Sequence, residues 1–177
     1  MSLLTTINPE NATGEVAEMY RGIQSVMGRV PSVMQLWSAS PFLMRQNWDY
    51  SNYMMQHPTL TMQLSATIRM LISEQNDCRY CIDFNAALLI DHCQWTEEQV
   101  LATRANYADS PLNEREKCLL GFVLKATHDS HSVTADDVAN LRTQGWTDCD
   151  IYDALNHAAR MVAGDIMINA LKVERDF

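Results

Sequence analysis

Apolar residues recur along the chain at intervals of three and four, which is the spacing of one face of an α-helix. The plainest example follows Thr61, where the apolar stripe consists of Leu64, Ile68, Leu71 and Ile72. No segment shows the sustained two-residue alternation and β-branched enrichment that is typical of a strand. The pattern therefore predicts an all-α protein.

Prolines and capping residues divide this pattern into separate helices. All five prolines lie at or before position 111, and each falls at the edge of a segment. The helices expected from these breaks cover about residues 12–27, 32–39, 41–57 and 79–91. N-cap candidates for the other helices are Thr61, Thr96, Asn113, Thr134 and Thr147. Two of them, Thr96 and Asn113, begin capping boxes because Gln99 and Glu116 follow three positions later.

The last helix, which begins after Thr147, is expected to be long and to reach about Lys172. Its expected buried stripe consists of Ile151, Leu155, Ala158, Val162 and Ile166. In total the pattern predicts seven or eight helices in a single domain spanning residues 1–177. Within it, residues 1–60 are expected to form an N-terminal helical extension and residues 61–177 the core.

Charge and hydropathy exclude two classes of partner. The chain has 177 residues and a formal net charge of −9 at pH 7, with 22 acidic and 13 basic residues. An acidic surface repels phosphate backbones, so no nucleic-acid partner is expected. No apolar run approaches the roughly 18 residues of a membrane-spanning helix, and the first residues do not have the basic start and apolar stretch of a secretory signal. We therefore expect a cytoplasmic protein with no membrane partner.

The chain has five cysteines, and two of them, Cys78 and Cys81, lie only three positions apart. Most cytosolic thiols stay reduced, so a close pair is typical of catalysis or metal binding. Side chains at i and i+3 of a helix face the same way, and the two sulfurs can therefore close a disulfide or hold a metal. The amides at a helix N-terminus stabilise a thiolate, as does the positive charge of Arg79, whereas nearby carboxylates such as Glu74 raise a thiol pKa. The sequence leaves this balance open.

Three other interpretations of the pair have to be considered. A lone Cys-x-x-Cys also occurs by chance as a structural feature. A zinc site needs a second pair of ligands, and the nearby His92 and Cys93 do not match the usual spacing, so no metal is expected. Thioredoxin-type chemistry normally follows a strand, whereas an amphipathic helix precedes this pair.

The segment around the cysteine pair resembles a known family. It shows a Ser-x-x-Asn-x-Cys-x-Tyr-Cys core, which is formed here by Ser73, Asn76, Cys78, Tyr80 and Cys81. A Gly-x-Val-Pro element also occurs, at positions 28–31. Both are similar to elements of the alkylhydroperoxidase D-like family, which includes the carboxymuconolactone decarboxylases, and in particular of its peroxidase-related branch. The resemblance implies an all-α, alkylhydroperoxidase D-like fold and a homo-oligomer, from dimers and trimers to hexamers.

The same resemblance implies an antioxidant enzyme that reduces hydroperoxides. Cys81 matches the cysteine that attacks the peroxide and becomes a sulfenic acid, and Cys78 matches the one that resolves this acid to a disulfide. A dithiol reductant then restores the pair by thiol–disulfide exchange, without a metal or any other cofactor. Tyr80 and Asn85 are expected to shape the pocket, and Arg79 is expected to assist thiolate formation.

Two positions depart from the family pattern. The histidine that the pattern places four residues after the second cysteine is Asn85 here, and the glutamate twelve residues before the first cysteine is Ala66. Neither side chain can take up a proton at neutral pH. Two residues are candidates for a rebuilt relay: Glu74, four positions before Cys78, and His157 in the long last helix.

These departures leave alternatives to a peroxidase. One is a helical, oligomeric binding or scaffold protein that has lost turnover, and another is a protein that carries out slower disulfide exchange. A decarboxylase acting on a cyclic lactone is the least expected, because the decarboxylases of the family rely on histidine rather than on a cysteine pair.

Overall fold

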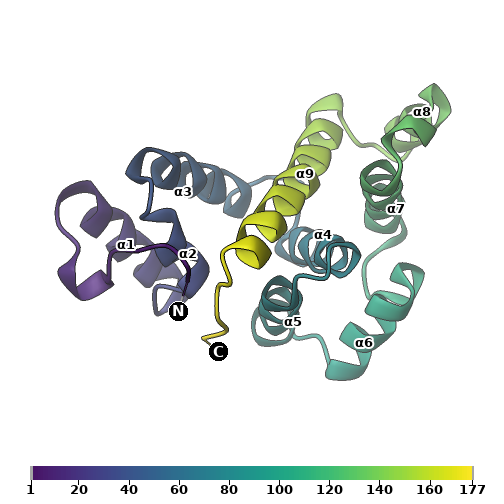
Figure 1. The fold of residues 1–177 in the computed structure, drawn as a ribbon. Helices are drawn as coiled ribbons and strands as arrows, with labels where there is room; N and C mark the ends of the chain where they lie inside the picture. The colour runs from purple at the N-terminus through teal and green to yellow at the C-terminus, as the bar shows by residue number, and fades with distance from the viewer. Residues whose placement is uncertain (1, 177) are drawn as a thin grey trace. The chain divides into compact units, whose positions relative to one another are not determined.

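Helices are the only regular elements in the computed structural model, which describes residues 2–176. The α-helices of that part of the chain are α1 (Gly14–Met27), α2 (Ser32–Trp37), α3 (Pro41–Met55), α4 (Met62–Gln75), α5 (Arg79–Cys93), α6 (Glu97–Ala105), α7 (Glu114–His128), α8 (Ala135–Thr143) and α9 (Asp148–Ala170) (Figure 1). Short 3₁₀ turns occur at Pro9–Asn11, Tyr107–Asp109 and Ser130–Ser132. The all-α prediction is confirmed. Among the described helices, none combines the length and the apolar character that crossing a bilayer requires.

Capping residues set the helix boundaries where the sequence places them. The side chain of Thr61 accepts a hydrogen bond from the backbone N–H of Leu64 at the start of α4. Complete capping boxes open α6 at Thr96 and α7 at Asn113. Pro41 is the first residue of α3, a position where its missing N–H costs no intrahelical hydrogen bond. The described residues contain nine α-helices where seven or eight were expected.

The described residues form two compact units. One unit is His57–Ile166, which contains α4 to α8 and most of α9. The other consists of the residues up to Gln56 together with those from Met167 onward. Its core includes Val16, Met19, Tyr20, Ile23, Val30, Met44 and Trp48. The cysteine pair and its described contacts lie within the unit His57–Ile166. The expected single domain, with an extension at 1–60 and a core at 61–177, stays a prediction.

Helix α4 lies at the centre of the unit His57–Ile166. It packs most extensively on α5 and also contacts α6 and α7 (Figure 1). All four residues of its predicted apolar stripe are buried, and so are Ala66, Thr67 and Ser73. A helix that is buried on most of its circumference belongs to the core of a domain. Groups at its C-terminal end are therefore held in a fixed, water-poor environment.

The buried face of α9 differs from the one that the sequence predicts. Ile151 and Ala158 are buried as expected, but Leu155 and Val162 are only half-buried, and 61% of Ile166 is exposed. The buried face instead includes two polar residues, His157 and Asp165. The prediction considered apolar residues only, and the face that it selected is therefore rotated about the helix axis relative to the buried face. Polar side chains occupy that face because partners on other helices satisfy them, as described below.

Candidate functional site

The two cysteines lie at the junction between α4 and α5. Asp77 adopts a left-handed backbone conformation, with φ of 51°, and turns the chain between the two helices. Cys78 follows as the N-cap of α5, and its backbone N–H donates to the carbonyl of Ser73. Cys81 lies in the first turn of α5, so both side chains lie on the same side of the helix start.

The two thiols are in direct contact and almost completely buried. The Sγ atoms of Cys78 and Cys81 are 3.0 Å apart, and the Cys78 thiol donates to the Cys81 sulfur. The exposed fractions of the two residues are 0% and 3%. A disulfide bond is about 2.05 Å long, so a movement of roughly 1 Å would join the two sulfurs. The short distance between the two sulfurs therefore suits the formation of a disulfide.

A carboxylate that the sequence analysis missed, that of Asp165, lies against both thiols. Asp165 belongs to α9 and is completely buried. The Ser73 hydroxyl donates to one of its oxygens and the Asn76 amide to the other, each over 3.0 Å. One oxygen of this carboxylate and the Sγ atoms of both cysteines all lie within 4.8 Å of one another. One sequence signal pointed to this position, because Asp165 follows the buried Ala158 by seven residues, or about two helical turns.

The surroundings of Cys81 favour its protonated thiol over the thiolate. The hydrogen bond with Cys78, burial and the negative charge of Asp165 all raise the pKa of Cys81 above its ordinary value. Burial also raises the pKa of Asp165, although the hydrogen bonds from Asn76, Cys81, Ser73 and Cys78 offset part of this shift. For Cys81, the balance that the sequence left open therefore favours the neutral thiol. The Arg79 side chain is exposed.

Arg69 forms hydrogen bonds with both Asn85 of α5 and His157 of α9. The Asn85 amide donates to the carbonyl of Cys81 over 2.8 Å and accepts a hydrogen bond from Nε of Arg69 over 2.6 Å. Nη1 of Arg69 lies 3.0 Å from Nε2 of His157, whose ring also hydrogen-bonds the backbone of Ser65. Burial and the adjacent Arg69 lower the pKa of His157 to about 3, so the ring is neutral. Because arginine only donates hydrogen bonds, Nε2 is the acceptor in this contact.

The remaining predicted site residues lie around the pair in different ways. Tyr80 is buried and stacks on Phe84, with the ring centroids 6.2 Å apart, and its expected place in a pocket wall stays a prediction. The Glu74 carboxylate forms an ion pair with Arg104 of α6, so its charge is already neutralised there. Ala66 is completely buried in α4 and brings no polar group.

The sequence matches no protein-family model and no curated protein. Its fold is nevertheless shared with solved structures. One is an uncharacterized peroxidase-related protein from Ralstonia eutropha JMP134, described as an alkylhydroperoxidase AhpD core, with a TM-score of 0.86 and 23% identity over 99% of this chain and 92% of that chain. Another is an uncharacterized peroxidase-related protein from Silicibacter sp. TM1040, with a TM-score of 0.81 and 21% identity over 97% and 92%. The chain has the alkylhydroperoxidase D-like fold.

Proteins with the alkylhydroperoxidase D-like fold do not all share one activity. The debrominase Bmp8, in a cysteine-to-alanine form in complex with 2,3,4-tribromopyrrole, matches with a TM-score of 0.76 and 15% identity over 98% of this chain and 91% of that chain. At such identities the likeness establishes the fold, and the activity has to be argued from the residues of this chain.

The cysteine pair and Asp165 are also the only group of potential metal ligands among residues 2–176. One sulfur from each cysteine and one carboxylate oxygen lie within 4.8 Å of one another. Three atoms are one fewer than the four that a closed zinc site uses, and no fourth candidate ligand joins them among the described residues. We assign no metal to these residues, and the expectation that the protein needs none stays a prediction.

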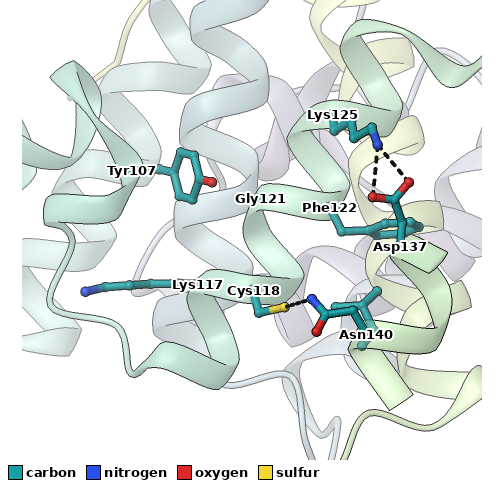
Figure 2. Close-up of a pocket in the computed structure, with 9 residues that line it drawn as sticks. Tyr107, Lys117, Cys118, Gly121, Phe122, Lys125, Asp137 and Asn140 are labelled. Atoms are coloured by element: carbon teal, nitrogen blue, oxygen red, sulfur yellow. Dashed lines mark hydrogen bonds and ion pairs between the residues drawn. The ribbon is translucent and has the colours of Figure 1, made fainter. Parts of the chain in front are cut away.

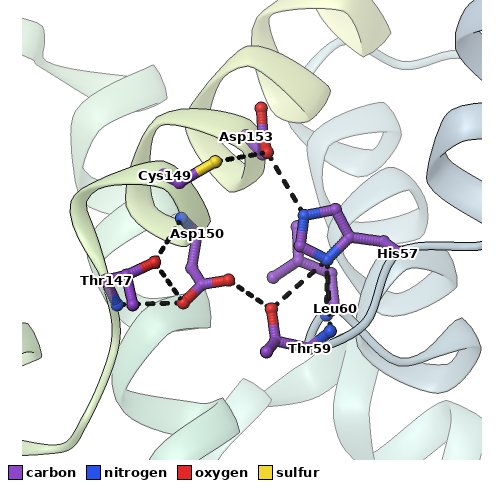
Figure 3. Close-up of polar contacts among 7 residues, drawn as sticks. All are labelled: His57, Thr59, Leu60, Thr147, Cys149, Asp150 and Asp153. Carbon is purple, nitrogen blue, oxygen red and sulfur yellow. Dashed lines mark hydrogen bonds and ion pairs between the residues drawn. The ribbon is translucent and has the colours of Figure 1, made fainter.

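A second polar cluster anchors the start of α9 (Figure 3). The His57 side chain is only 2% exposed, and its Nε2 lies 3.2 Å from the Asp153 carboxylate. Its Nδ1 accepts a hydrogen bond from the backbone of Leu60 over 3.0 Å, and the Cys149 thiol lies 3.4 Å from the same carboxylate. These contacts tie the segment before α4 to the first turns of α9. They therefore help to hold the helix on which Asp165 and His157 lie.

A small cavity of about 250 Å³ opens next to α7 and α8 (Figure 2). The ion pair between Lys125 and Asp137, at 2.7 Å, lies in its wall, and the Asn140 amide donates to Cys118 over 3.3 Å. Neither Cys78 nor Cys81 lines this cavity. It is thus separate from the cysteine site.

Proposed function

We propose that the protein is a thiol peroxidase that reduces hydroperoxides, alkyl hydroperoxides in particular, through Cys78 and Cys81. The observation that carries this proposal is the 3.0 Å separation of the two buried sulfurs at the start of α5. Two thiols so placed can give up two electrons and close a disulfide without any rearrangement of the helices. The fold shared with peroxidase-related proteins supports the same class of reaction.

The proposed cycle has three steps. The Cys81 sulfur attacks the terminal oxygen of the hydroperoxide, the O–O bond breaks, and the products are a Cys81 sulfenic acid and an alcohol. The Cys78 sulfur then attacks the Cys81 sulfur, which expels water and forms the disulfide. An external dithiol reduces this disulfide through a mixed disulfide and leaves as a disulfide itself. The hydroperoxide is reduced, the dithiol is oxidised, and no metal or other cofactor takes part.

Cysteine substitutions test this proposal. We expect Cys81→Ser to abolish peroxide consumption in the presence of a dithiol, because the attacking sulfur is gone. We expect Cys78→Ser to react once and then stop as a sulfenic acid, which a dimedone-type probe detects. The matched control is Cys149→Ser, which removes an exposed cysteine outside the pair and should keep the wild-type rate. Equal peroxide consumption by wild type and Cys81→Ser would overturn the proposal.

In a second candidate function, the two electrons of the cysteine pair reduce a substrate other than a hydroperoxide. Ala66 and Asn85 bring no acid or base to the positions where peroxidases of the resembling family have them, which favours a slower disulfide-exchange or binding protein. The fold shared with a debrominase favours the reductive removal of bromide from a small aromatic compound. In that reaction the two thiols would become a disulfide while a C–Br bond is replaced by C–H and bromide leaves. Measuring the rates at which the protein reduces brominated pyrroles, a small disulfide and hydroperoxides distinguishes these functions.

The proposed partners are a dithiol reductant and further copies of the same chain. A reductant is required because each turnover leaves Cys78 and Cys81 oxidised. Assembly as a dimer, trimer or hexamer is supported by the apolar side chains that α9 leaves partly exposed, namely Leu155, Val162 and Ile166.

A further inference from the structure

The proposed cycle needs a group that takes the proton of the attacking thiol. In this structure the Cys81 thiol is buried, and its surroundings favour the protonated form. A neutral thiol is a poor nucleophile, since the thiolate is the species that attacks peroxides and disulfides. Some nearby base must therefore receive the proton when the sulfur reacts.

The residues that the sequence suggested for this role are occupied elsewhere. Glu74 is paired with Arg104, and the Asn85 amide has no basic group. His157 accepts from Arg69 at Nε2, and its ring also hydrogen-bonds the backbone of Ser65. These contacts leave its ring nitrogens committed to groups other than the thiols.

Asp165 is the carboxylate that does lie next to the reacting atoms. It comes from α9, whereas the cysteines belong to the start of α5, and one of its oxygens lies within 4.8 Å of both sulfurs. The groups that face it are Ser73 and Asn76 from α4 and Cys78 and Cys81 from α5. Ser73 and Asn76 are neutral donors that hold the carboxylate in place, and no cation among residues 2–176 forms an ion pair with it.

We propose that Asp165 is the proton acceptor of the Cys78/Cys81 pair, a role for which α9 supplies the carboxylate that α4 lacks at Ala66. This inference rests on the redox function proposed above and names the base for it. In this role Asp165 is a catalytic residue, because its carboxylate lies within 4.8 Å of both sulfurs that react.

The proton movements balance over the cycle. As the Cys81 sulfur attacks the hydroperoxide, its proton moves to the Asp165 carboxylate, and the alkoxide released from the O–O bond takes a proton back from Asp165 to become the alcohol. As the Cys78 sulfur attacks the sulfenic acid, its proton again moves to Asp165. The hydroxide that leaves Cys81 takes this proton and becomes water. Asp165 is thus a carboxylate again at the end of each step.

Burial shifts the pKa of Asp165 in the direction that suits a general base. A general base is most effective when its pKa lies near the working pH, and burial raises the pKa of Asp165 from its usual acidic value toward that range. The same negative charge raises the pKa of Cys81. These two effects of Asp165 have opposite consequences for the rate, and an experiment can separate them.

The test is the pH dependence of oxidation of the pair in Asp165→Asn and in the wild type. The oxidant is a small aromatic disulfide, so that the readout does not depend on peroxidase activity. In the wild type we expect the rate to rise as Asp165 ionises and then to stay level until the thiol itself ionises. In Asp165→Asn we expect no level region: the rate should rise tenfold per pH unit up to the thiol pKa. At pH 7 the variant should be slower by on the order of 100-fold, although its thiol pKa is lower.

Two further variants complete the experiment. Asp165→Glu keeps a carboxylate and should retain the level region. The matched control is Asp77→Asn, which removes a negative charge next to Cys78 and suits the left-handed backbone there, and it should follow the wild-type profile. A wild-type rate that rises tenfold per pH unit throughout, or an Asp165→Asn variant as fast as wild type at pH 7, would overturn the inference. If the disulfide profile holds but hydroperoxides do not react, the peroxidase proposal fails and the role of Asp165 stands.

Discussion

Arg69 explains, at the scale of single residues, why Asn85 is suited to its position. Its guanidinium donates to the Asn85 oxygen and to the His157 ring, and it can do so only because both groups offer an acceptor. A protonated histidine at position 85 would offer none and would place a second positive charge beside Arg69. The position that holds a base in the resembling family therefore has a structural role here. Proton transfer is left to another helix.

The neutral state of His157 makes the protein sensitive to acid. Burial, and then the charge of Arg69, lower its pKa from 6.5 to about 3. Between these pH values the unfolded chain binds a proton at this residue and the folded chain does not, so stability decreases as the pH falls. This residue should contribute a decrease of about 1 kcal/mol per pH unit in the middle of that range.

Urea unfolding at pH 7, 5 and 4 measures this effect. We expect His157→Gln to lose less stability between pH 7 and pH 4 than the wild type does. His128→Gln is the control, since that histidine is exposed, and it should follow the wild type. Identical pH dependence in wild type and His157→Gln would show that the histidine is not held neutral by folding.

At the scale of helices, local sequence signals predicted the helix boundaries and the cysteine pair. They did not identify the buried polar groups. Capping boxes and prolines placed the helix boundaries, because a cap depends only on neighbours in sequence. The cysteine pair was identified for the same reason, since its spacing places it at one helix start. Asp165 was missed because its burial depends on Ser73 and Asn76, which are about 90 positions away in sequence. The helical spacing from Ala158 marks the position, but a pattern built on apolar residues does not select an aspartate for a buried face.

Thr61 connects two helix starts, and its removal should affect both. Its hydroxyl accepts from the Leu64 backbone and donates to Oε1 of Glu116 over 2.7 Å. Glu116 is buried and belongs to the capping box of α7. We expect Thr61→Ala to lower the free energy of unfolding by about 1 kcal/mol for the lost cap and by a further ~1–3 kcal/mol for the buried carboxylate left with one donor fewer.

The comparison is with Thr134→Ala, which removes a capping residue whose partner, Asp137, is only half-buried and is also paired with Lys125. That variant should lose only the cap contribution of about 1 kcal/mol. Urea unfolding of both variants at pH 7 gives the two values. Equal losses would mean that the link between α4 and α7 adds nothing to stability.

At the scale of the whole molecule, the outer side of α9 is the surface that a second copy is expected to cover. Val162 and Leu155 line an apolar groove of about 450 Å³ with residues of α7, and Ile166 follows one turn after Val162. Ile166 and Leu101 have the same exposed fraction, 61%, but Leu101 lies on α6. Variants at these two positions therefore show whether the location of an apolar residue, and not its exposed fraction alone, determines assembly.

We expect Ile166→Asp to shift the protein toward smaller species in sedimentation velocity at a fixed concentration, because it places a charge in the apolar face. Leu101→Asp should leave the distribution unchanged. If Leu101→Asp dissociates the assembly and Ile166→Asp does not, the interface lies elsewhere on the molecule.

The position of Cys78 as the N-cap of α5 has a thermodynamic consequence. A disulfide to Cys81 would close a ring within one helical turn, so it would remove very little freedom from the unfolded chain. Its stabilisation should be smaller than the roughly 3 kcal/mol that the chain-entropy relation gives for a 15-residue loop. A bond that adds little to the folded state is easily reduced again. On the proposed function, the pair could therefore gain and lose two electrons repeatedly with little change in the stability of the fold.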